Sequence, residues 1–495
     1  MIAAATMHGP HIDWAGLAPI LALLGGGVLV LVLGLLRSRF VRETIVPAVA
    51  LVAFAATIGL AAWRWNHHAS LVSGALASDD FALAITSICC AAGIFGVLLS
   101  WRSLAAREAG QGEYYALVLT TCSGLMFLAA ARDLITIFLA LELSSIPQYI
   151  LAGWGKDQKS SEAGLKYLLL GAIASSLLLY GMALLYGVTG TTLLDGIAQS
   201  IQTDGESYRA LLVLSMVLMI AGFGFKMAVV PFQMWVPDVY QGAPTPVAAF
   251  LSVGSKAAAF AVVTRIFFLA LPAKFLSDDW SMVFAIIAAV SMTAGNLAAI
   301  VQTDIKRMLG YSSIAQAGTF MIGLAAISVT GNEFTLGASA VLLYTATYAF
   351  TNLGAFVAII AISQKIGSDQ IKDYAGMWKR SPFLSLALAF CLVSLTGIPP
   401  TAGFWAKLYV FNAGMRADLT WLVMIGVANS VLSGYYYLAV VRQMFLGDAE
   451  DGRTIRTTPS IGMALSAATL GVLVFGILPM PLISAAENAV EIFAR

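Results

Sequence analysis

Residues 229–247 read VVPFQMWVPDVYQGAPTPV and place four prolines between two long apolar segments. Proline lacks a backbone N–H and clashes with the preceding helical turn, so a helix cannot run unbroken through this stretch. The apolar residues on both sides predict that the break lies inside a membrane. Backbone groups that are freed at membrane depth must face protein or water. The stretch therefore predicts a spanning helix with an interruption that water and ions can reach.

The composition assigns the whole chain to the membrane proteins. Of 495 residues, 60% are hydrophobic and only 11% are charged, whereas a soluble domain is nearer half apolar and a quarter charged. The net charge of +1 gives no basic surface for nucleic acid. The four cysteines lack the paired spacing of zinc or iron–sulfur ligands, and no nucleotide-binding fingerprint occurs. We expect no metal, cofactor or nucleotide site in this chain.

Fourteen apolar segments are long enough to span a bilayer, which takes about 20 residues each. No Lys or Arg precedes the first segment, which predicts a retained helix and not a cleaved signal peptide. The least secure boundary, between the fourth and fifth spans, depends on a short turn at Arg132 and Asp133. The predicted spans are 15–36, 44–63, 80–100, 113–131, 133–151, 163–187, 209–230, 246–271, 280–301, 309–328, 334–364, 382–412, 418–446 and 460–480.

The Lys and Arg residues are distributed unevenly between the two sides of these spans. If the N-terminus lies outside, 16 of them fall in inner segments, 6 in outer segments and 5 within spans. Positive residues are enriched on the cytoplasmic side of membrane proteins. We therefore predict that both termini lie on the periplasmic side, with the tail after Pro481 along the outer surface.

A weak internal repeat divides the chain. The stretch SSIPQ at 144–148 matches SSIAQ at 312–316, 168 residues later, and the same offset carries Pro231 onto Pro399. Each unit holds five spans, an odd number, so the second unit must be inverted, and inverted repeats with interrupted helices are typical of secondary transporters. We predict an all-α polytopic membrane protein with broken seventh and twelfth helices. Its parts are an N-terminal three-helix segment (1–112), a first five-helix repeat (113–271), a second inverted repeat (280–446) and a C-terminal helix with a surface tail (447–495).

Ionisable residues inside the spans are the candidate functional residues. Each charge near the membrane midplane costs about 2.5–3.5 kcal/mol on insertion scales, so several of them indicate a use. They are Glu142 in the fifth span, Lys226 before Pro231, Lys256 in the eighth span and Lys407 after the second break. A purely structural alternative is a buried ion pair, such as Glu142 with Lys226, which leaves two lysines unexplained. Buried groups of this kind can take and release protons near physiological pH.

Two other cations within the spans are open to simpler interpretations. Lys166 lies one turn inside the sixth span near Glu162, and it either handles protons or reaches back to the surface. Arg265 lies near a predicted helix end and is interpreted as an anchor. All four histidines precede residue 69. A proton path would therefore use Lys, Glu, hydroxyl side chains and water.

Three long stretches resemble a known family. They are EAGLKYLLLGAIASSLLLYGMALLYG (162–187), GFGFKMAVVPFQMWVPDVYQGAPTPVAAF (222–250) and LTGIPPTAGFWAKLYVF (395–411). They are similar to the antiporter-like membrane subunits of respiratory complex I, and the resemblance covers essentially the whole chain. It implies fourteen helices with two inverted five-helix repeats. It also implies proton-handling roles for Glu142, Lys226, Lys256 and Lys407, with Lys166 as a fifth member.

This resemblance implies a translocase subunit without a redox centre of its own. Electrons would pass from NADH through FMN and iron–sulfur clusters to quinone in partner subunits, while this chain moves protons outward. Its neighbours in the bacterial inner membrane would be the M, K, J and A subunits of the membrane arm. Two alternatives stay open: a subunit of a multi-subunit Na⁺/H⁺ antiporter, and a scaffold that transmits conformational change without carrying protons.

Overall fold

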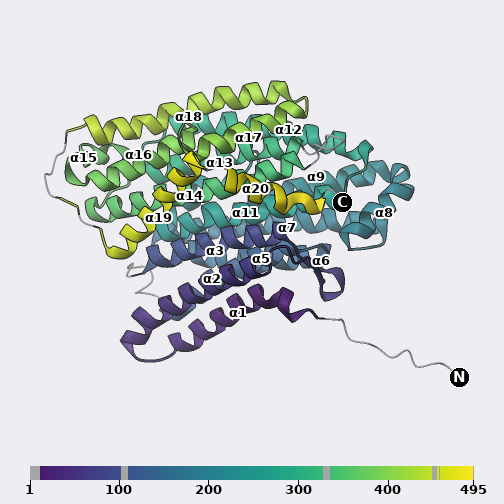
Figure 1. Cartoon of the computed structure of the whole chain (residues 1–495), viewed down its shortest axis with the longest axis horizontal. Helices are drawn as coiled ribbons and strands as arrows, with labels where there is room; N and C mark the ends of the chain where they lie inside the picture. Colours follow the sequence, from purple (N-terminus) through teal and green to yellow (C-terminus); the bar gives the residue numbers. More distant parts are fainter. Residues whose placement is uncertain (1–11, 102–109, 327–334, 449–453, 456, 494–495) are drawn as a thin grey trace.

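The computed structural model describes residues 12–101, 110–326, 335–448, 454–455 and 457–493. Within these residues the chain is almost entirely helical, and the long helices lie side by side along one common direction (Figure 1). Both chain ends fall outside the described residues, so the side of the membrane on which they lie stays a prediction.

The elements keep the labels of Figure 1 throughout. Two short strands, β1 (Ala69–Leu71) and β2 (Leu76–Ser78), pair antiparallel. Short 3-10 or π turns are η1 (Val41–Ile45), η2 (Val72–Gly74), η3 (Gly205–Tyr208), η5 (Ile371–Tyr374) and η6 (Glu491–Phe493). The α-helices are α1 (Trp14–Gly34), α2 (Val46–Trp63), α3 (Asp80–Ser100), α5 (Gln111–Ala130), α6 (Leu134–Ala152), α7 (Gln158–Thr189), α8 (Leu194–Asp204), α9 (Arg209–Met227), α10 (Trp235–Gly242), α11 (Thr245–Leu269), α12 (Lys274–Ile300), α13 (Ile305–Ala325), α14 (Leu336–Ile366), α15 (Met377–Arg380), α16 (Pro382–Thr396), α17 (Ala402–Arg416), α18 (Thr420–Leu446), α19 (Pro459–Ile477) and α20 (Met480–Val490).

Twelve helical segments in the described part of the chain are long and apolar enough to cross a membrane. Each span predicted from the sequence overlaps a helix of the structure. Two predicted spans are not among the twelve: 309–328 corresponds to the less apolar helix α13, and 382–412 is divided into α16 and α17. The prediction of a polytopic helical membrane protein is confirmed, and the turn at Arg132 and Asp133 does separate α5 from α6.

The helices α11 and α14 form the centre of the bundle. Nearly every residue of both is buried, as expected of helices that are apolar all round. Helices α3, α5 and α9 pack on α11, and α13, α16, α17 and α19 pack on α14. At the contact of α5 with α6, a Cβ on Gly124 would lie 2.5 Å from the Ser144 backbone nitrogen. Only glycine allows this approach, which places the SSIPQ stretch inside the bundle.

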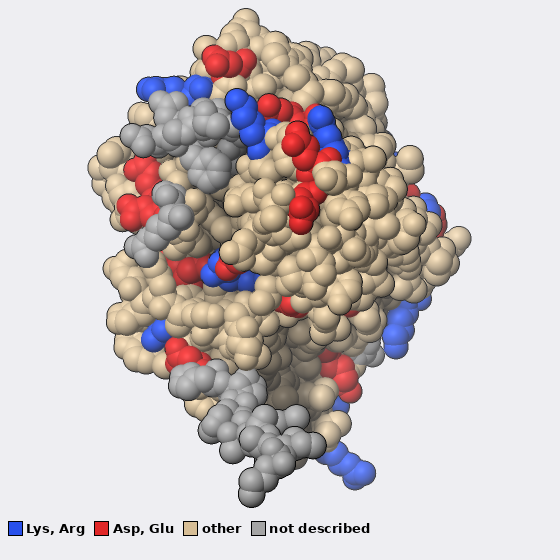
Figure 2. Space-filling model, turned by 90° about the vertical axis from the view of Figure 1, so that its right-hand side faces the viewer, with Lys and Arg blue, Asp and Glu red and all other residues tan. Residues whose placement is uncertain are grey.

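Some elements were not predicted from the sequence. They are the β1–β2 hairpin and the amphipathic helix α8, which lies at one end of the bundle (Figure 1). The predicted surface tail is the helix α20, one side of which is buried against α3 and α14. Figure 2 views the end of the bundle at which α8 lies, and positive and negative side chains are interspersed there in small groups. Two of the ion pairs from elements at this end are Arg132–Asp195 (2.7 Å) and Arg209–Asp279 (2.9 Å).

Candidate functional site

The two predicted helix breaks are present and have similar caps. Helix α9 ends at Ala228 in the left-handed conformation (φ 64°), and the Val229 N–H donates to the Gly224 carbonyl (3.0 Å). Helix α16 ends at Gly397 (φ 88°), and the Ile398 N–H donates to the Val393 carbonyl (3.3 Å). Both are Schellman-type ends that satisfy only some of the last carbonyls of the helix. The carbonyls that these bonds leave unsatisfied can accept hydrogen bonds from nearby side chains.

Lys226 lies in the last turn of α9, with only 2% of its surface exposed. Its ammonium group donates to Ser145 Oγ (2.8 Å) and Gln148 Oε1 (2.9 Å), both on α6. Tyr167 on α7 donates to the same Gln148 oxygen (2.9 Å). The lysine is therefore held by neutral groups of the SSIPQ stretch and not by a direct ion pair with Glu142.

Glu142 is half-buried, one turn before Ser145 on α6. Its carboxylate accepts a hydrogen bond from Ser175 Oγ on α7 (2.5 Å). Ser175, Ser145 and Lys226 line a common cavity of about 10 Å³, which is close to the smallest volume that holds one water molecule. The structure thus brings Glu142 and Lys226 to the same place, with serine hydroxyls and a small cavity between them.

Lys256 lies in the middle of the buried helix α11, also 2% exposed. Its ammonium group donates to both the carbonyl and the hydroxyl of Ser313 on α13. The Ser313 hydroxyl also contacts the hydroxyls of Tyr240 (3.1 Å) and Tyr348 (3.2 Å). The ring of Tyr348 lies 5.8 Å from the ammonium nitrogen, a cation–π distance.

Lys407 lies on α17, just after the second break, and is 6% exposed. Its ammonium group donates to the Thr396 carbonyl at the end of α16 (2.9 Å) and to Ser430 Oγ on α18 (3.2 Å). The adjacent Leu395 carbonyl accepts from Gln316 Nε2 (3.0 Å). The helix break therefore provides one carbonyl that holds this lysine and a second that holds Gln316.

The two copies of the repeated stretch occupy comparable places. Gln148 accepts from Tyr167 on α7, and Gln316 accepts from Tyr344 on α14 (2.5 Å). Gln148 contacts Lys226 near the end of α9, and Gln316 contacts Leu395 near the end of α16. A short motif detected in the sequence thus becomes two sets of polar contacts, each beside a broken helix.

Comparison with known proteins agrees with this arrangement. A sequence profile described as "NADH:quinone oxidoreductase/Mrp antiporter, TM" matches residues 131–433, which is more than half of the chain. The chain belongs to this family. The matched residues include α6 to α17, and thus both breaks and all three buried lysines.

Individual members of the family are similar over most of their length. NADH-quinone oxidoreductase subunit N of Trichlorobacter lovleyi is 43% identical over 442 residues, covering 89% of this chain and 88% of the relative. NAD(P)H-quinone oxidoreductase subunit 2 of Prochlorococcus marinus is 42% identical over 482 residues, covering 94% of this chain and 90% of the relative.

Solved structures of related complexes contain chains with a similar fold. A chain of respiratory complex I from Thermus thermophilus with bound aureothin is 32% identical and superposes with a TM-score of 0.80, covering 94% of this chain and 98% of that chain. A chain of the Mrp complex from Dietzia sp. superposes with a TM-score of 0.81, covering 96% of each chain, at 22% identity. At that identity the second likeness shows the fold alone.

Lys166 differs from the three buried lysines in its surroundings. It is about 44% exposed and pairs with Glu162 (2.6 Å) and with Asp238 on α10 (2.8 Å). Asp238 also pairs with Arg307 on α13 (2.7 Å). The structure therefore places Lys166 in an ion-pair cluster near the start of α7. This cluster is separate from the groups to which the buried lysines donate hydrogen bonds.

Arg265 does lie near the end of α11, as predicted, but its side chain is buried and the interpretation as an anchor is wrong. Its side chain is 1% exposed, and its guanidinium forms two hydrogen bonds of 2.9 Å with the carboxylate of Asp79. A third bond runs to the Ala129 carbonyl (3.0 Å). Asp79 also caps the first turn of α3. The pair thus ties α3, α5 and α11 together inside the bundle.

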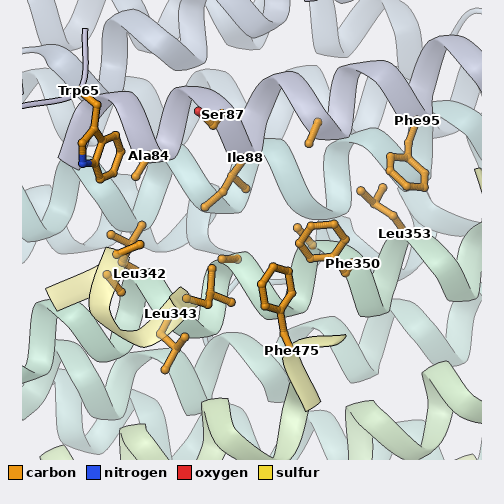
Figure 3. A pocket seen from close by; sticks show the side chains of 16 residues that line it. Trp65, Ala84, Ser87, Ile88, Phe95, Leu342, Leu343, Phe350, Leu353 and Phe475 are labelled. Carbon is orange, nitrogen blue, oxygen red and sulfur yellow. The ribbon is translucent and has the colours of Figure 1, made fainter. Parts of the chain in front are cut away.

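An apolar groove of about 270 Å³ lies between α3, α14, α19 and α20 (Figure 3). Ile88 and Phe95 come from α3, Leu342 and Phe350 from α14, and Phe475 from α19. The lining contains no ionisable side chain. The groove therefore offers nothing to a proton, and the candidate site is the set of buried lysines.

Proposed function

We propose that this chain is the N-type, proton-translocating subunit in the membrane arm of a bacterial NADH:quinone oxidoreductase. Relatives that carry the name of subunit N are more than 40% identical over most of their length. The resemblance also implies a glutamate in M-type subunits at the position where this chain has Lys407, which favours the N type over the M type. NADH, FMN, iron–sulfur clusters and quinone belong to partner subunits, and this chain uses their energy to move protons outward.

The observation that carries this proposal is that the three buried lysines are held by neutral groups. Lys226, Lys256 and Lys407 donate to serine hydroxyls, a glutamine oxygen and backbone carbonyls. A charge held inside a membrane protein is costly, and such residues commonly belong to ion or proton pathways. A carboxylate beside an amine would stabilise its protonated form and oppose release of the proton. An amine that is surrounded by neutral hydroxyls can therefore bind and release a proton more readily.

The contacts suggest how the lysine sites are linked along the bundle. A water molecule in the cavity beside Ser175 would connect Glu142 with Lys226. Between Lys226 and Lys256 lie three aromatic residues: Tyr167 stacks on Trp235 (4.3 Å between ring centroids), and Trp235 contacts Tyr240 (6.4 Å). The hydroxyl of Tyr240 then reaches Ser313, the partner of Lys256. Protonation of one lysine would change the electrostatic potential at the next, which couples their titrations.

We propose fourteen spanning helices in two inverted units, 113–271 and 280–446, flanked by the segments 1–112 and 447–495. The matching helix ends at Gly224–Val229 and Val393–Ile398 support this division. The corresponding contacts of Gln148 and Gln316 support it as well. In this arrangement α9 with α10 and α16 with α17 are the broken seventh and twelfth helices.

The exposed side of α6 supports the presence of a neighbouring subunit. Ile135, Leu139, Ile146 and Ile150 form an apolar stripe with exposed fractions of 47–61%, and Glu142 lies in the middle of it. A carboxylate in contact with lipid tails would be costly, so a protein partner on this side is the better arrangement. We propose the M subunit or one of the small K, J and A subunits for this place, in the bacterial inner membrane with both termini periplasmic.

We propose Lys166 as the residue that passes protons between the aqueous phase and the buried lysines. Its exposure and its position beside the broken helix support this role. Asp238, its partner, belongs to α10, which follows the break directly. The pair with Glu162 would hold the lysine side chain close to the helix.

The test compares two driving forces in sealed inverted membrane vesicles. We expect that deletion of this chain abolishes most NADH-driven proton uptake. Na⁺/H⁺ exchange measured with an imposed sodium gradient and without NADH should be unchanged, and the chain should co-purify with subunits that contain flavin. Loss of sodium exchange with normal NADH-driven proton uptake would favour the antiporter alternative.

A further inference from the structure

A cavity with polar side chains in its lining lies at the end of the bundle where α12 and α18 meet η5. Its volume is about 480 Å³, and its lining includes Gln302, Lys372, Arg442 and the buried side chain of Tyr436. Lys372 in η5 and Arg442 near the end of α18 are on the side that the charge distribution predicts to be cytoplasmic. The lining of the cavity carries charged and amide side chains to which water can hydrogen-bond, unlike that of the apolar groove of Figure 3.

A series of polar side chains leads from this cavity into the bundle. Tyr436 donates its hydroxyl to Asn296 Oδ1 on α12 (3.0 Å). The amide of Asn296 in turn donates to Asn429 Oδ1 on α18 (3.0 Å). Ser430, the next residue, accepts from Lys407 (3.2 Å). Tyr436, Asn296 and Asn429 are each 5% exposed or less, so they form an internal connection and not a solvated surface.

The spacing along α18 explains why these residues line one path. Asn429, Ser433, Tyr436, Val440 and Gln443 follow one another at intervals of three or four residues, so they share one face of the helix. Gln443, Val440 and Tyr436 line the cavity, and Asn429 lies two turns deeper, next in sequence to Ser430, the partner of Lys407. Ser433, 3% exposed, lies between these two levels.

We propose that this cavity is an aqueous entrance to Lys407 and that Tyr436, with Asn296 and Asn429, is its gate. This inference rests on the proposed function of Lys407 as a proton carrier. A carboxamide has no proton that it releases near neutral pH, so the two asparagines position water and do not carry the proton themselves. Rotation of the Tyr436 side chain breaks its bond to Asn296 and lets water from the cavity reach Ser430 and Lys407. The proton then passes along that water to or from the lysine amine.

The test measures access to position 433 in the intact complex. A Ser433→Cys variant places a thiol behind the gate, and the native cysteines of this chain that could compete are all buried. A charged, membrane-impermeant methanethiosulfonate reagent is added to inverted vesicles and, separately, to right-side-out vesicles. Adding Tyr436→Ala should raise the rate of labelling about tenfold, because the loss of one or two buried hydrogen bonds makes opening of the gate easier by about that factor. The increase should occur only when the reagent is added from the cytoplasmic side.

Tyr435→Ala is the matched control. Tyr435 is the preceding residue of the same helix and also lines the cavity, but the residue is 68% exposed. Labelling of the thiol introduced by Ser433→Cys should stay slow in this control. Equal labelling in the two tyrosine variants, or faster labelling from the periplasmic side, would overturn the proposed entrance.

A second measurement tests the hydroxyl alone. Tyr436→Phe keeps the ring and removes the bond to Asn296, and we expect fewer protons translocated per NADH than in Tyr435→Phe. An unchanged ratio would overturn the gating role of the hydroxyl. The labelling experiment requires no proton transfer, so it separates the two proposals. Labelling that depends on Tyr436, together with normal proton translocation in a Lys407→Ala complex, would overturn the role of Lys407 and leave the entrance in place.

Discussion

Replacing Lys226 with alanine should slow proton transfer through this chain by about a hundredfold or more, the usual effect of removing a group that transfers protons directly. The amine lies between Ser145, Gln148 and the cavity beside Ser175, and alanine can neither bind a proton nor hold water there. The loss of two hydrogen bonds to neutral groups costs about 1–3 kcal/mol each at most. The complex should therefore still assemble. The measurement is the number of protons translocated per NADH by the purified complex in liposomes.

Two further variants separate the carriage of protons from a fixed positive charge. Lys226→Arg keeps the charge, but a guanidinium does not release its proton in proteins, so this variant should fail as well. If the scaffold alternative were right, the arginine variant would work. Lys274→Ala removes an exposed lysine at the start of α12 and should leave the proton ratio unchanged. A normal ratio in an assembled Lys226→Ala complex would exclude a proton-carrying role for this residue.

The sequence predicts the helices of this protein well because each depends on local information. About twenty apolar residues must form a helix if they span a bilayer, and proline in the interior must interrupt it. The spans and both breaks follow from these two facts. The divided span 382–412 shows the limit of hydropathy. Gly397 to Thr401 include no charged residue, so hydropathy does not divide the span there, and only the prolines reveal the break.

The candidate site was predictable as a set of residues but not as a set of contacts. Lysine inside an apolar span is visible in the sequence, because its cost in the membrane makes it rare. Its partner is not visible, because Ser313 lies 57 residues from Lys256 and Ser145 lies 81 residues from Lys226. The repeated SSxxQ stretch was the only signal that these serines and glutamines belong to the site. Tyr240 and Asn296 carried no such signal and were missed.

The burial of Glu142 and of Arg265 was misjudged for a related reason. Position along a span gives depth in the membrane, but it does not give the direction of the side chain. Glu142 lies mid-span and yet is partly exposed on α6, whereas Arg265 lies near the end of α11 and is fully buried. Hydropathy cannot distinguish these cases, because α11 is covered by other helices, most of them distant in sequence, and its end is no more accessible than its middle.

Replacing Arg265 with methionine should destabilise the folded chain by about 3–5 kcal/mol, because it leaves the carboxylate of Asp79 buried without its partner. This is the largest stability effect we expect from a single substitution at an ion pair of this protein. The measurement is the temperature at which the purified complex aggregates, together with the amount of complex assembled. Arg209→Met is the matched control: its pair with Asp279 has the same 2.9 Å distance, but the two side chains are 54% and 39% exposed. An exposed pair contributes about 0–1 kcal/mol, so this control should be nearly unchanged.

A double-mutant cycle separates the ion pair from the packing of the arginine side chain. Asp79→Asn alone keeps an oxygen that can cap α3 through the Ala82 N–H, but it leaves the guanidinium buried without a counter-charge. Combined with Arg265→Met, neither charge is left unpaired. The double variant should therefore be less destabilised than the sum of the two single variants, by about 1–3 kcal/mol. Strict additivity would show that the two charges do not depend on each other, and the cost of Arg265→Met would then come from lost contacts with Phe81 and Phe493, whose rings lie within 6 Å of the guanidinium.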